Sequence, residues 1–317
     1  MRDNLYQQTC VPDVAVVVPV YNRVTLLPRA VESLLNQKGD VALEIIIVDD
    51  GSTDGSADAV RDLDARVHIV TQPNRGIAAA RRAGIEAAKA PWVTFLDSDD
   101  VAAPRKVVAL WSALREGAQA GAVAAFASAD LIGGGPLLEA KFPRGVLTPK
   151  SLMEDPLECL LRYGGFIPSM NILTTVELAL KCARMNFGGA AEDYDFALRL
   201  ARFGPFVFVD ENLIHCERQA DGETNANGHR LVASSIIAAE EAVKWSGRGD
   251  LAVNAARTAR MDECWASALV QVTLRGDWAL AARVLWIGLR RASWPANIRT
   301  LYWAIDWYLR RRSKPTS

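Results

Sequence analysis

Apolar positions along the first hundred residues follow two patterns that alternate with each other. Continuous apolar runs, typical of strands buried on both faces, cover residues 14–20, 43–48, 67–70 and 92–96. Between these runs apolar residues recur at helical spacing, over residues 26–35, 57–63 and 77–90. Strands and helices that alternate at this pace predict βαβ units with right-handed crossovers. We therefore expect an α/β fold with a Rossmann-like, mostly parallel sheet flanked by helices.

The pattern is less regular after residue 100. Ser151 and Glu154 have the spacing of a capping box, and Thr174 or Thr175 is suited to cap a later helix. Further helices are expected over residues 105–114, up to 163, up to 184 and over 192–203, and further strands over 122–126 and 206–209. Residues 217–229 show no periodicity, so we predict a flexible loop there. The loop separates an α/β domain, residues 1–216, from a helical extension, residues 230–317.

The strongest chemical signal is the acidic sequence Asp97-Ser98-Asp99-Asp100, directly after the fourth predicted strand. In open α/β sheets, ligands bind outside the C-terminal ends of the strands. Clustered carboxylates repel one another, and sites made only of oxygen ligands favour Mg²⁺ or Mn²⁺. Asp97 and Asp99 are therefore candidate metal ligands, and such a metal would offset charge on a departing diphosphate. Taken alone, the triplet is equally well explained as an acidic turn that caps a helix.

A second acidic turn, Asp49-Asp50-Gly51-Ser52-Thr53-Asp54, follows the second strand. Its glycine and small polar residues allow a flat ligand to approach the backbone. A carboxylate at the strand end can accept the imide N–H of a pyrimidine base, which makes Asp49 the candidate for that contact. Asp54 and Ser56 are better explained as helix N-cap residues.

Two further turns lie at the same edge of the predicted sheet. Tyr21 could stack on a base, although the turn Pro19-Val20-Tyr21-Asn22 alone is unremarkable. Residues 72–77 lead into a helix that carries Arg81 and Arg82, and a helix N-terminus with guanidinium groups suits a diphosphate. For Arg82, a solvated helix face is an equally good explanation.

Acidic residues also open a later helix at Glu192-Asp193-Tyr194-Asp195. The helix dipole favours them there, and it favours the deprotonated form that a general base requires. Asp193 shares a helical face with Ala197, so we expect it at the margin of the core. Asp195 and Arg199, four residues apart, are expected to pair on the surface.

Taken together, PVYN, VDDGSTD, NRGIAAAR, FLDSDD and EDYDFALRL resemble the family 2 glycosyltransferases with the GT-A fold, over about residues 13–217. The resemblance implies inverting transfer of a sugar from a nucleoside diphosphate sugar, usually UDP-linked, to a hydroxyl of a glycan or glycolipid acceptor. Residues 1–216 would then be the nucleotide-sugar-binding catalytic domain. The sequence contains no QxxRW motif, which favours a non-processive enzyme of polysaccharide or glycolipid biosynthesis.

The resemblance also implies roles for single residues. The nucleotide pocket would be lined by Pro19, Tyr21 and Arg75, with Asp49 on the base. The DxD positions fall on Asp97 and Asp99, with Ser98 between them, as ligands of the metal and the diphosphate. The general base falls on Asp193. The family often has asparagine at the position of Arg82, so we assign that residue no role.

The C-terminal region differs in charge from the rest of the chain. From Arg283 onward there are eight basic residues and one acidic residue, although the net charge of the chain is −1. Six of the nine tryptophans lie beyond residue 264, a composition that suits an interface with anionic lipid headgroups. Packing against the α/β domain explains the tryptophans slightly better, whereas residues 298–314 favour peripheral membrane contact. We expect no nucleic-acid partner.

The five cysteines are far apart and form no CxxC pair, which argues against a disulfide framework or a zinc site. A reducing compartment is therefore expected. The N-terminal residues do not have the pattern of a signal peptide, and no run of about 18 apolar residues occurs. These features predict a cytoplasmic location, with peripheral attachment to the inner face of the membrane.

Two other functions fit parts of the sequence. A non-catalytic nucleotide-sugar-binding protein of the same fold is the main alternative, but it would not need a base at Asp193. A nucleotide-sugar pyrophosphorylase would be expected to carry a glycine-rich phosphate loop after the first strand, and residues 19–23 contain no glycine.

Overall fold

The structure, a computed structural model, describes residues 11–132, 151–164, 167, 171–184, 191–217, 223–248 and 250–291. The strands are β1 (Val14–Val20), β2 (Leu43–Asp49), β3 (Val67–Thr71), β4 (Trp92–Phe95), β5 (Val101–Ala102), β6 (Ala124–Leu131), β7 (Leu152–Met153), β8 (Ile172–Thr175) and β9 (Phe206–Cys216). The helices are α1 (Leu27–Leu35), α2 (Ile77–Ala87), α3 (Lys106–Gly117), α4 (Pro156–Tyr163), α5 (Val176–Cys182), α6 (Glu192–Leu200), α7 (Glu223–Ser246), α8 (Leu251–Leu274) and α9 (Trp278–Arg291).

The strands form one sheet in the order β3-β2-β1-β4-β8-β6-β9-β5, and β7 pairs with β9. The first four strands in this order are parallel, as the βαβ pattern predicts. β8 lies antiparallel between β4 and β6, and β6 is parallel to β9. The α/β class and the mostly parallel sheet flanked by helices, both expected from the sequence, are confirmed.

The sheet has a hydrophobic core on each face. In β1, Val14, Val16 and Val18 belong to the core shared with α1 and α3, whereas Ala15 and Val17 belong to the core on the opposite face. Alternate side chains of a strand point to opposite faces, so a strand buried on both faces must be apolar throughout. The second core is covered by α2, α4, α5 and α6.

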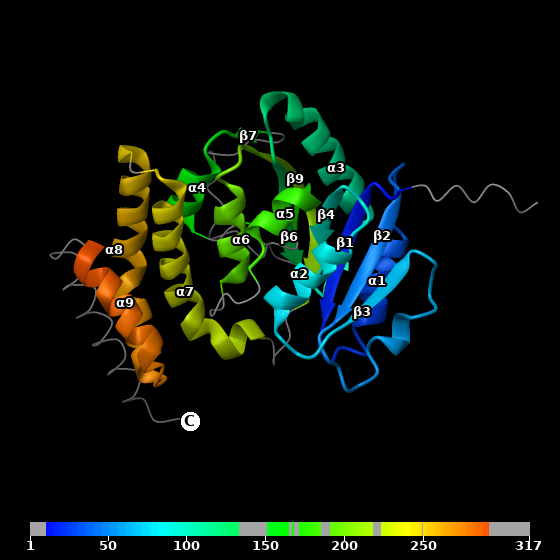
Figure 1. Cartoon of the computed structure of the whole chain (residues 1–317), viewed down its shortest axis with the longest axis horizontal. Helices are drawn as coiled ribbons and strands as arrows, with labels where there is room; N and C mark the ends of the chain where they lie inside the picture. The colour runs from blue at the N-terminus through cyan, green and yellow to red at the C-terminus, as the bar shows by residue number, and fades with distance from the viewer. Residues whose placement is uncertain are drawn as a thin grey trace, which may run out of the picture.

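Helices α7, α8 and α9 lie together at one end of the molecule, away from β1–β3 (Figure 1). They share a third core, in which Trp265 Nε1 donates to the carbonyl of Val284 at 2.7 Å. α8 also packs against α4, and α7 against α6, so these helices are joined to the helices that cover the sheet. None of the helices in the described ranges is long and apolar enough to cross a membrane. Residues 298–314 lie outside the described residues.

Two local predictions are corrected by the structure, and a third is confirmed. Residues 223–229, expected in a flexible loop, form the start of α7. The cap of α4 is Asp155, which accepts a hydrogen bond from the Glu158 N–H, because Leu152 and Met153 pair with β9 instead of opening a helix at Ser151. Thr175 caps α5, as one of the two predicted alternatives.

Candidate active site

The acidic turns of the sequence meet at the C-terminal edge of the parallel strands. Asp49 is the last residue of β2, Tyr21 follows β1 directly, and Asp97 comes two residues after β4 ends at Phe95. Because β1 lies between β2 and β4, the three turns are neighbours. Asp193 lies in the first turn of α6 and is connected to this edge through Arg81.

Arg81 joins the two acidic motifs. Its Nη2 donates to Asp97 Oδ1 at 2.9 Å, its Nη1 donates to Asp193 Oδ1 at 2.6 Å, and Glu192 Oε1 lies 3.5 Å from Nη1. Arg81 is only 6% exposed, so water screens these charges weakly. Burial acts to lower the pKa of Arg81, but Asp193, Asp97 and Glu192 outweigh it and raise that pKa above its ordinary value. One side chain thus spans the gap between the predicted DxD motif and the predicted base.

The turn before α2 fixes where this helix begins, and therefore fixes the position of Arg81. Asp50 accepts hydrogen bonds from the backbone N–H groups of Arg75 at 2.9 Å and Gly76 at 2.8 Å, and from Gln72 Nε2 at 2.7 Å. Asp50 is buried, and these donors satisfy its carboxylate. The sequence interpretation gave Asp50 no role. Its position at the end of a buried strand was the available signal, since a carboxylate there needs partners.

Asp49 has one carboxylate oxygen engaged. Its Oδ1 accepts the Ser52 N–H at 2.8 Å, which closes the turn after β2. Within the described part of the chain, no partner occupies Oδ2. An oriented carboxylate with one free acceptor matches the predicted contact with the imide N–H of a base.

A buried lysine holds the end of the strand that leads into the DxD turn. Lys106 is fully buried, and its Nζ donates to the carbonyl of Phe95 at 2.8 Å and to Thr94 Oγ1 at 3.1 Å. The Phe95 carbonyl lies two residues before Asp97, so the bond fixes the end of β4. Burial lowers the pKa of Lys106 to about 7, against the opposing effects of Asp97 and Asp100.

The far side of the turn is held by α1 and β9. Arg29 Nη2 donates to the carbonyl of Asp99 at 3.0 Å and pairs with Glu217. Asp100, which is buried, accepts the Glu217 N–H at 3.3 Å and lies 3.4 Å from Cys216 Sγ. The backbone around the DxD motif is therefore fixed by residues distant in sequence.

The site holds more carboxylates than the nearby cations neutralise. Burial, followed by Asp97 and Asp99, raises the pKa of Asp100 to about 8. Burial, followed by Asp193, raises the pKa of Glu192 to about 7. The pKa of Asp97 is also raised, mainly by burial and despite Arg81. This excess of negative charge favours the binding of a cation.

The residues present fit a divalent metal. The carboxylate of Asp99 has no hydrogen-bonding partner in the described ranges, and Asp97 engages only Arg81 there. No group of three or more possible ligands converges among the described residues, so these two carboxylates would need donor oxygens and water to complete a coordination shell. Mg²⁺ and Mn²⁺ accept such a mixed oxygen shell.

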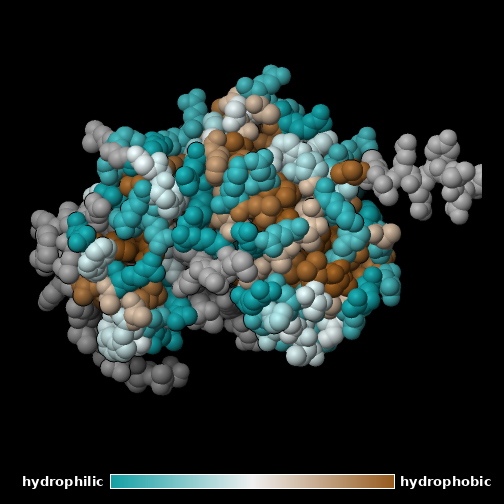
Figure 2. All heavy atoms as spheres, viewed as in Figure 1, coloured by the Kyte–Doolittle hydropathy of each residue, from teal (hydrophilic) through white to brown (hydrophobic). Residues whose placement is uncertain are grey.

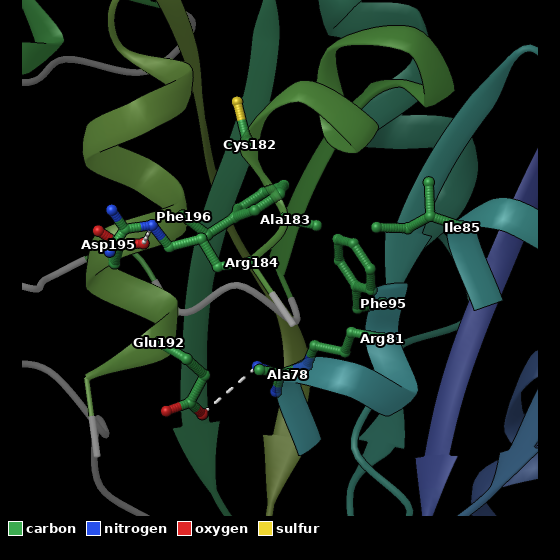
Figure 3. Close-up of a pocket in the computed structure, with 10 residues that line it drawn as sticks. All are labelled: Ala78, Arg81, Ile85, Phe95, Cys182, Ala183, Arg184, Glu192, Asp195 and Phe196. Atoms are coloured by element: carbon green, nitrogen blue, oxygen red, sulfur yellow. Dashed lines mark hydrogen bonds and ion pairs between the residues drawn. The ribbon is translucent and has the colours of Figure 1, made fainter. Parts of the chain in front are cut away.

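A small pocket of about 30 Å³ lies behind Arg81, between α2, α5 and α6 (Figure 3). Arg81 and Glu192 line one part of it, and Asp195 and Arg184 face each other at another. Phe95 and Phe196, whose rings meet edge to face at 5.7 Å, form an apolar wall. The pocket therefore places an apolar surface directly beside the acidic site.

The remaining predicted site residues occupy different environments. Pro19 is buried within β1, opposite Val48, and Ser98 is buried in the DxD turn. Tyr21 is 48% exposed, and Arg75 is exposed, so both are accessible to a ligand. A ligand that touches these residues would lie against the outer edge of the sheet.

Two polar residues near the site are structural. Asp195 was expected in a surface pair with Arg199, and the pair forms at 2.8 Å, but Asp195 is buried, since α6 packs against α5. Arg82 pairs with Glu86 and donates to the carbonyls of Leu180 and Ala183. These bonds join α2 to the end of α5 and account for Arg82 without a ligand.

Residues 15–136 match the model of glycosyl transferase family 2. The match makes this segment similar to family 2 glycosyltransferases. It contains every strand-end turn described above, whereas Asp193 lies beyond it.

Curated relatives of the family 2 segment include the putative glycosyltransferase EpsH of Bacillus subtilis (strain 168), which is 45% identical over 92 residues, 28% of this chain and 26% of that protein. The succinoglycan biosynthesis protein ExoO of Rhizobium meliloti (strain 1021) is 43% identical over 99 residues, 31% of this chain and 28% of that protein. The chain thus spans about a quarter of the length of these relatives.

Solved structures resemble more of the chain. S. aureus TarS 1-349 in complex with UDP-GlcNAc has a TM-score of 0.67 at 15% identity, over 94% of this chain and 92% of that one. The mannosyltransferase PcManGT from Pyrobaculum calidifontis, in complex with GDP-Man and Mn²⁺, has a TM-score of 0.53 at 19% identity, over 92% and 84%. At these identities the likeness establishes the fold.

Proposed function

We propose that the chain is an inverting, non-processive glycosyltransferase that moves a sugar from a nucleoside diphosphate sugar, UDP-linked, to a hydroxyl of a glycan or glycolipid acceptor. The observation that carries the proposal is the Arg81 bridge, which brings the DxD residue Asp97 and the candidate base Asp193 within the span of one guanidinium. The family 2 match and the relative named for succinoglycan biosynthesis support the same reaction class. The UDP-GlcNAc bound by TarS supports the choice of donor.

The donor would be bound along the strand ends. Asp49 accepts the imide N–H of the base through its free oxygen, and Tyr21 offers an exposed ring for stacking. Arg75 and the N-terminus of α2 face the diphosphate. Arg81 exchanges one of its carboxylate partners for a phosphate oxygen, since both are charged acceptors of the same guanidinium bonds.

The chemistry needs a base and a neutralised leaving group. Asp193, released from Arg81 by the diphosphate, accepts the proton of the acceptor hydroxyl as that oxygen attacks the anomeric carbon in line. The diphosphate leaves from the opposite face, so the configuration of the anomeric carbon inverts. Mn²⁺ or Mg²⁺ held by Asp97 and Asp99 would supply positive charge at the leaving diphosphate.

A panel assay tests the proposal. Release of nucleoside diphosphate from UDP-, GDP- and TDP-linked sugars is measured with a library of glycan and lipid-linked acceptors, with Mn²⁺, with Mg²⁺ or with EDTA. The proposal predicts metal-dependent release with a UDP-linked donor, stimulated by an acceptor. Full activity in EDTA would contradict the metal site. Donor binding without turnover on any acceptor would favour the nucleotide-sugar-binding alternative.

We also propose that two parts of the chain have different functions. Residues 1–216 form the catalytic domain, and residues 230–317 form a helical extension whose residues 298–314 contact the inner face of the cell membrane. The support is the basic and tryptophan-rich composition of that stretch, together with an acceptor class that includes glycolipids.

A further inference from the structure

His215 and Asp130 form a polar pair on neighbouring strands. They are register partners in β9 and β6, and His215 Nδ1 lies 2.5 Å from Asp130 Oδ1. The second carboxylate oxygen of Asp130 receives a longer contact of 3.4 Å from Asn212 Nδ2. The side chains are 39% and 26% exposed. The pair is thus open to solvent on one side and fixed by the sheet on the other.

The pair lies on the same face of the sheet as Arg81 and Asp193. Ile214 and Cys216, on either side of His215, both belong to the core under α1 and α3, so His215 points to the opposite face. Ala129 belongs to that same core, which places Asp130 on the opposite face as well. That opposite face is the one covered by α2 and α6, the helices that carry the candidate catalytic residues.

Strands β6 and β9 change from buried apolar to partly exposed polar side chains near this pair. On the shared face, Phe126 of β6 and Phe208 of β9 are buried against each other, with ring centroids 5.3 Å apart. The register then shifts around Ser128, and Asp130 and His215 follow it. Irregularities of this kind re-aim side chains and are common beside active sites.

The pair also adjoins the DxD turn from the side opposite the nucleotide. His215 is the register partner of Val101, the residue after Asp100. In the strand order, β6 and β9 lie beyond β4, whereas β2, with Asp49, lies on its other side. With strands about 4.8 Å apart, β6 is roughly 10 Å from β4. Because the proposed nucleotide contact, Asp49, lies on the other side of β4, an acceptor would approach from this side.

The chemistry of the pair suits a hydroxyl group. In the neutral imidazole, a carboxylate at Nδ1 holds the proton on that nitrogen, which leaves a lone pair on Nε2. Nε2 has no hydrogen-bonding partner among the described residues. We propose that Asp130 and His215 form a subsite that binds a hydroxyl of the acceptor saccharide, with Nε2 as the hydrogen-bond acceptor. The inference rests on the proposed transferase function and names a part of its acceptor site.

Imidazole nitrogen NMR on the full chain tests the subsite directly. The chain has three histidines, and the His215→Asn variant identifies the signals of His215. With UDP and Mg²⁺ present, methyl glycosides of glucose, galactose and N-acetylglucosamine are titrated to their solubility limits, and inorganic phosphate serves as an anionic probe. We expect at least one glycoside to shift Nε2 of His215 and leave the exposed His68 unchanged. No shift with any glycoside, or a shift with phosphate alone, would overturn the proposal.

Kinetics distinguish a subsite from a structural pair. Asparagine at position 215 can keep the bond to Asp130 but leaves the place of Nε2 empty, whereas glutamine can reach that place. His215→Asn should raise the acceptor KM about tenfold, the cost of one hydrogen bond, and leave donor hydrolysis unchanged, while His215→Gln recovers part of the loss. His68→Asn is the matched control. An equal loss of donor hydrolysis and transfer would mean that His215 only supports the DxD turn. If no nucleotide sugar is turned over at all, the proposed function fails, and the NMR titration still decides the subsite.

Discussion

Arg81 carries one positive charge among three carboxylates in a position almost closed to solvent. Arg61, by contrast, pairs with Asp58 on the surface, with both side chains more than half exposed. The two pairs have similar distances but different surroundings. At the scale of single residues, burial therefore decides which ion pairs contribute to the stability of this protein.

Replacement of Arg81 by methionine should destabilise the chain by about 2–4 kcal/mol, because it leaves buried carboxylates without a cation. Arg61→Met should cost less than about 0.5 kcal/mol. Urea unfolding in EDTA measures both. Added Mn²⁺ should restore part of the loss in Arg81→Met only, and a loss no larger than that of Arg61→Met would contradict the bridge.

Lys106 predicts a dependence of stability on pH. Burial holds its pKa at about 7 in the folded chain, against 10.5 ordinarily, so the unfolded chain binds more protons between these values. Stability should therefore rise with pH across that window, by up to about 4 kcal/mol from pH 7 to pH 10 relative to Lys106→Met. Unfolding curves of both proteins, with Lys38→Met as an exposed control, check the slope. A constant difference across the window would contradict it.

At the scale of elements, the close approach of α2 to the sheet sets the position of Arg81. A Cβ atom at Gly84 would lie 2.3 Å from Val17 Cγ1 and 3.0 Å from Val48 Cγ2. Any larger residue must push α2 away from β1 and β2, and Arg81 would move with it. The glycine is thus required by packing, since it lies within a helix where alanine would otherwise be preferred.

Gly84→Ala should lower the free energy of unfolding by about 1–3 kcal/mol through this clash. Val17→Ala removes the obstructing methyl groups, so the double variant should be more stable than the sum of the single effects predicts. A double-mutant cycle by urea unfolding measures the coupling. Additive effects would show that α2 tolerates the extra methyl group by other means.

The elements differ in how far they could be predicted. β1 to β4 were found to within one residue at each end, because strands buried on both faces are continuously apolar. β9 was predicted only to Val209, since exposed Asp210, Glu211 and Asn212 interrupt its pattern. β8 was missed because four residues carry no periodic signal and its place between β4 and β6 depends on the whole sheet.

Prediction of the site from the sequence is limited in the same way, because some of its contacts depend on the whole fold. The aspartates of both motifs are visible in the sequence because each follows a strand or opens a helix. The Arg81–Asp193 bond joins residues 112 positions apart, so it appears only when α2 and α6 are packed on one face. The roles of Asp50 and Lys106 depend equally on contacts with distant backbone groups.

At the scale of the whole molecule, the face shown in Figure 2 exposes hydrophobic residues in several places, with hydrophilic residues between and around them. The C-terminal helices have a core of their own and keep several aromatic and apolar residues exposed, among them Trp278 at 68% and Trp286 at 50%. Trp286 also carries Arg290 over its ring at 4.2 Å. Tryptophan beside arginine suits the proposed location of this end at a lipid headgroup layer.

Charge reversal tests the membrane proposal without shortening the chain. Replacing Arg310, Arg311 and Arg312 by glutamate should lower partitioning onto vesicles with anionic lipid by at least about tenfold, since each basic residue near such a surface contributes about 1 kcal/mol. Co-sedimentation measures the bound fraction, with Arg61→Glu as the control on the body of the protein. Equal partitioning of all three proteins would contradict membrane contact.

The most direct test of the central claim is the rate of sugar transfer by Asp193→Asn, measured beside donor affinity on the same preparation. Asparagine keeps the size of the side chain and can still contact Arg81, but it cannot accept the acceptor's proton. The account predicts a fall in kcat of about 10²–10⁴-fold with the Kd of the nucleotide sugar within a few-fold of the unmodified chain. Full transfer activity in Asp193→Asn would contradict the assignment of the base, and with it the mechanism.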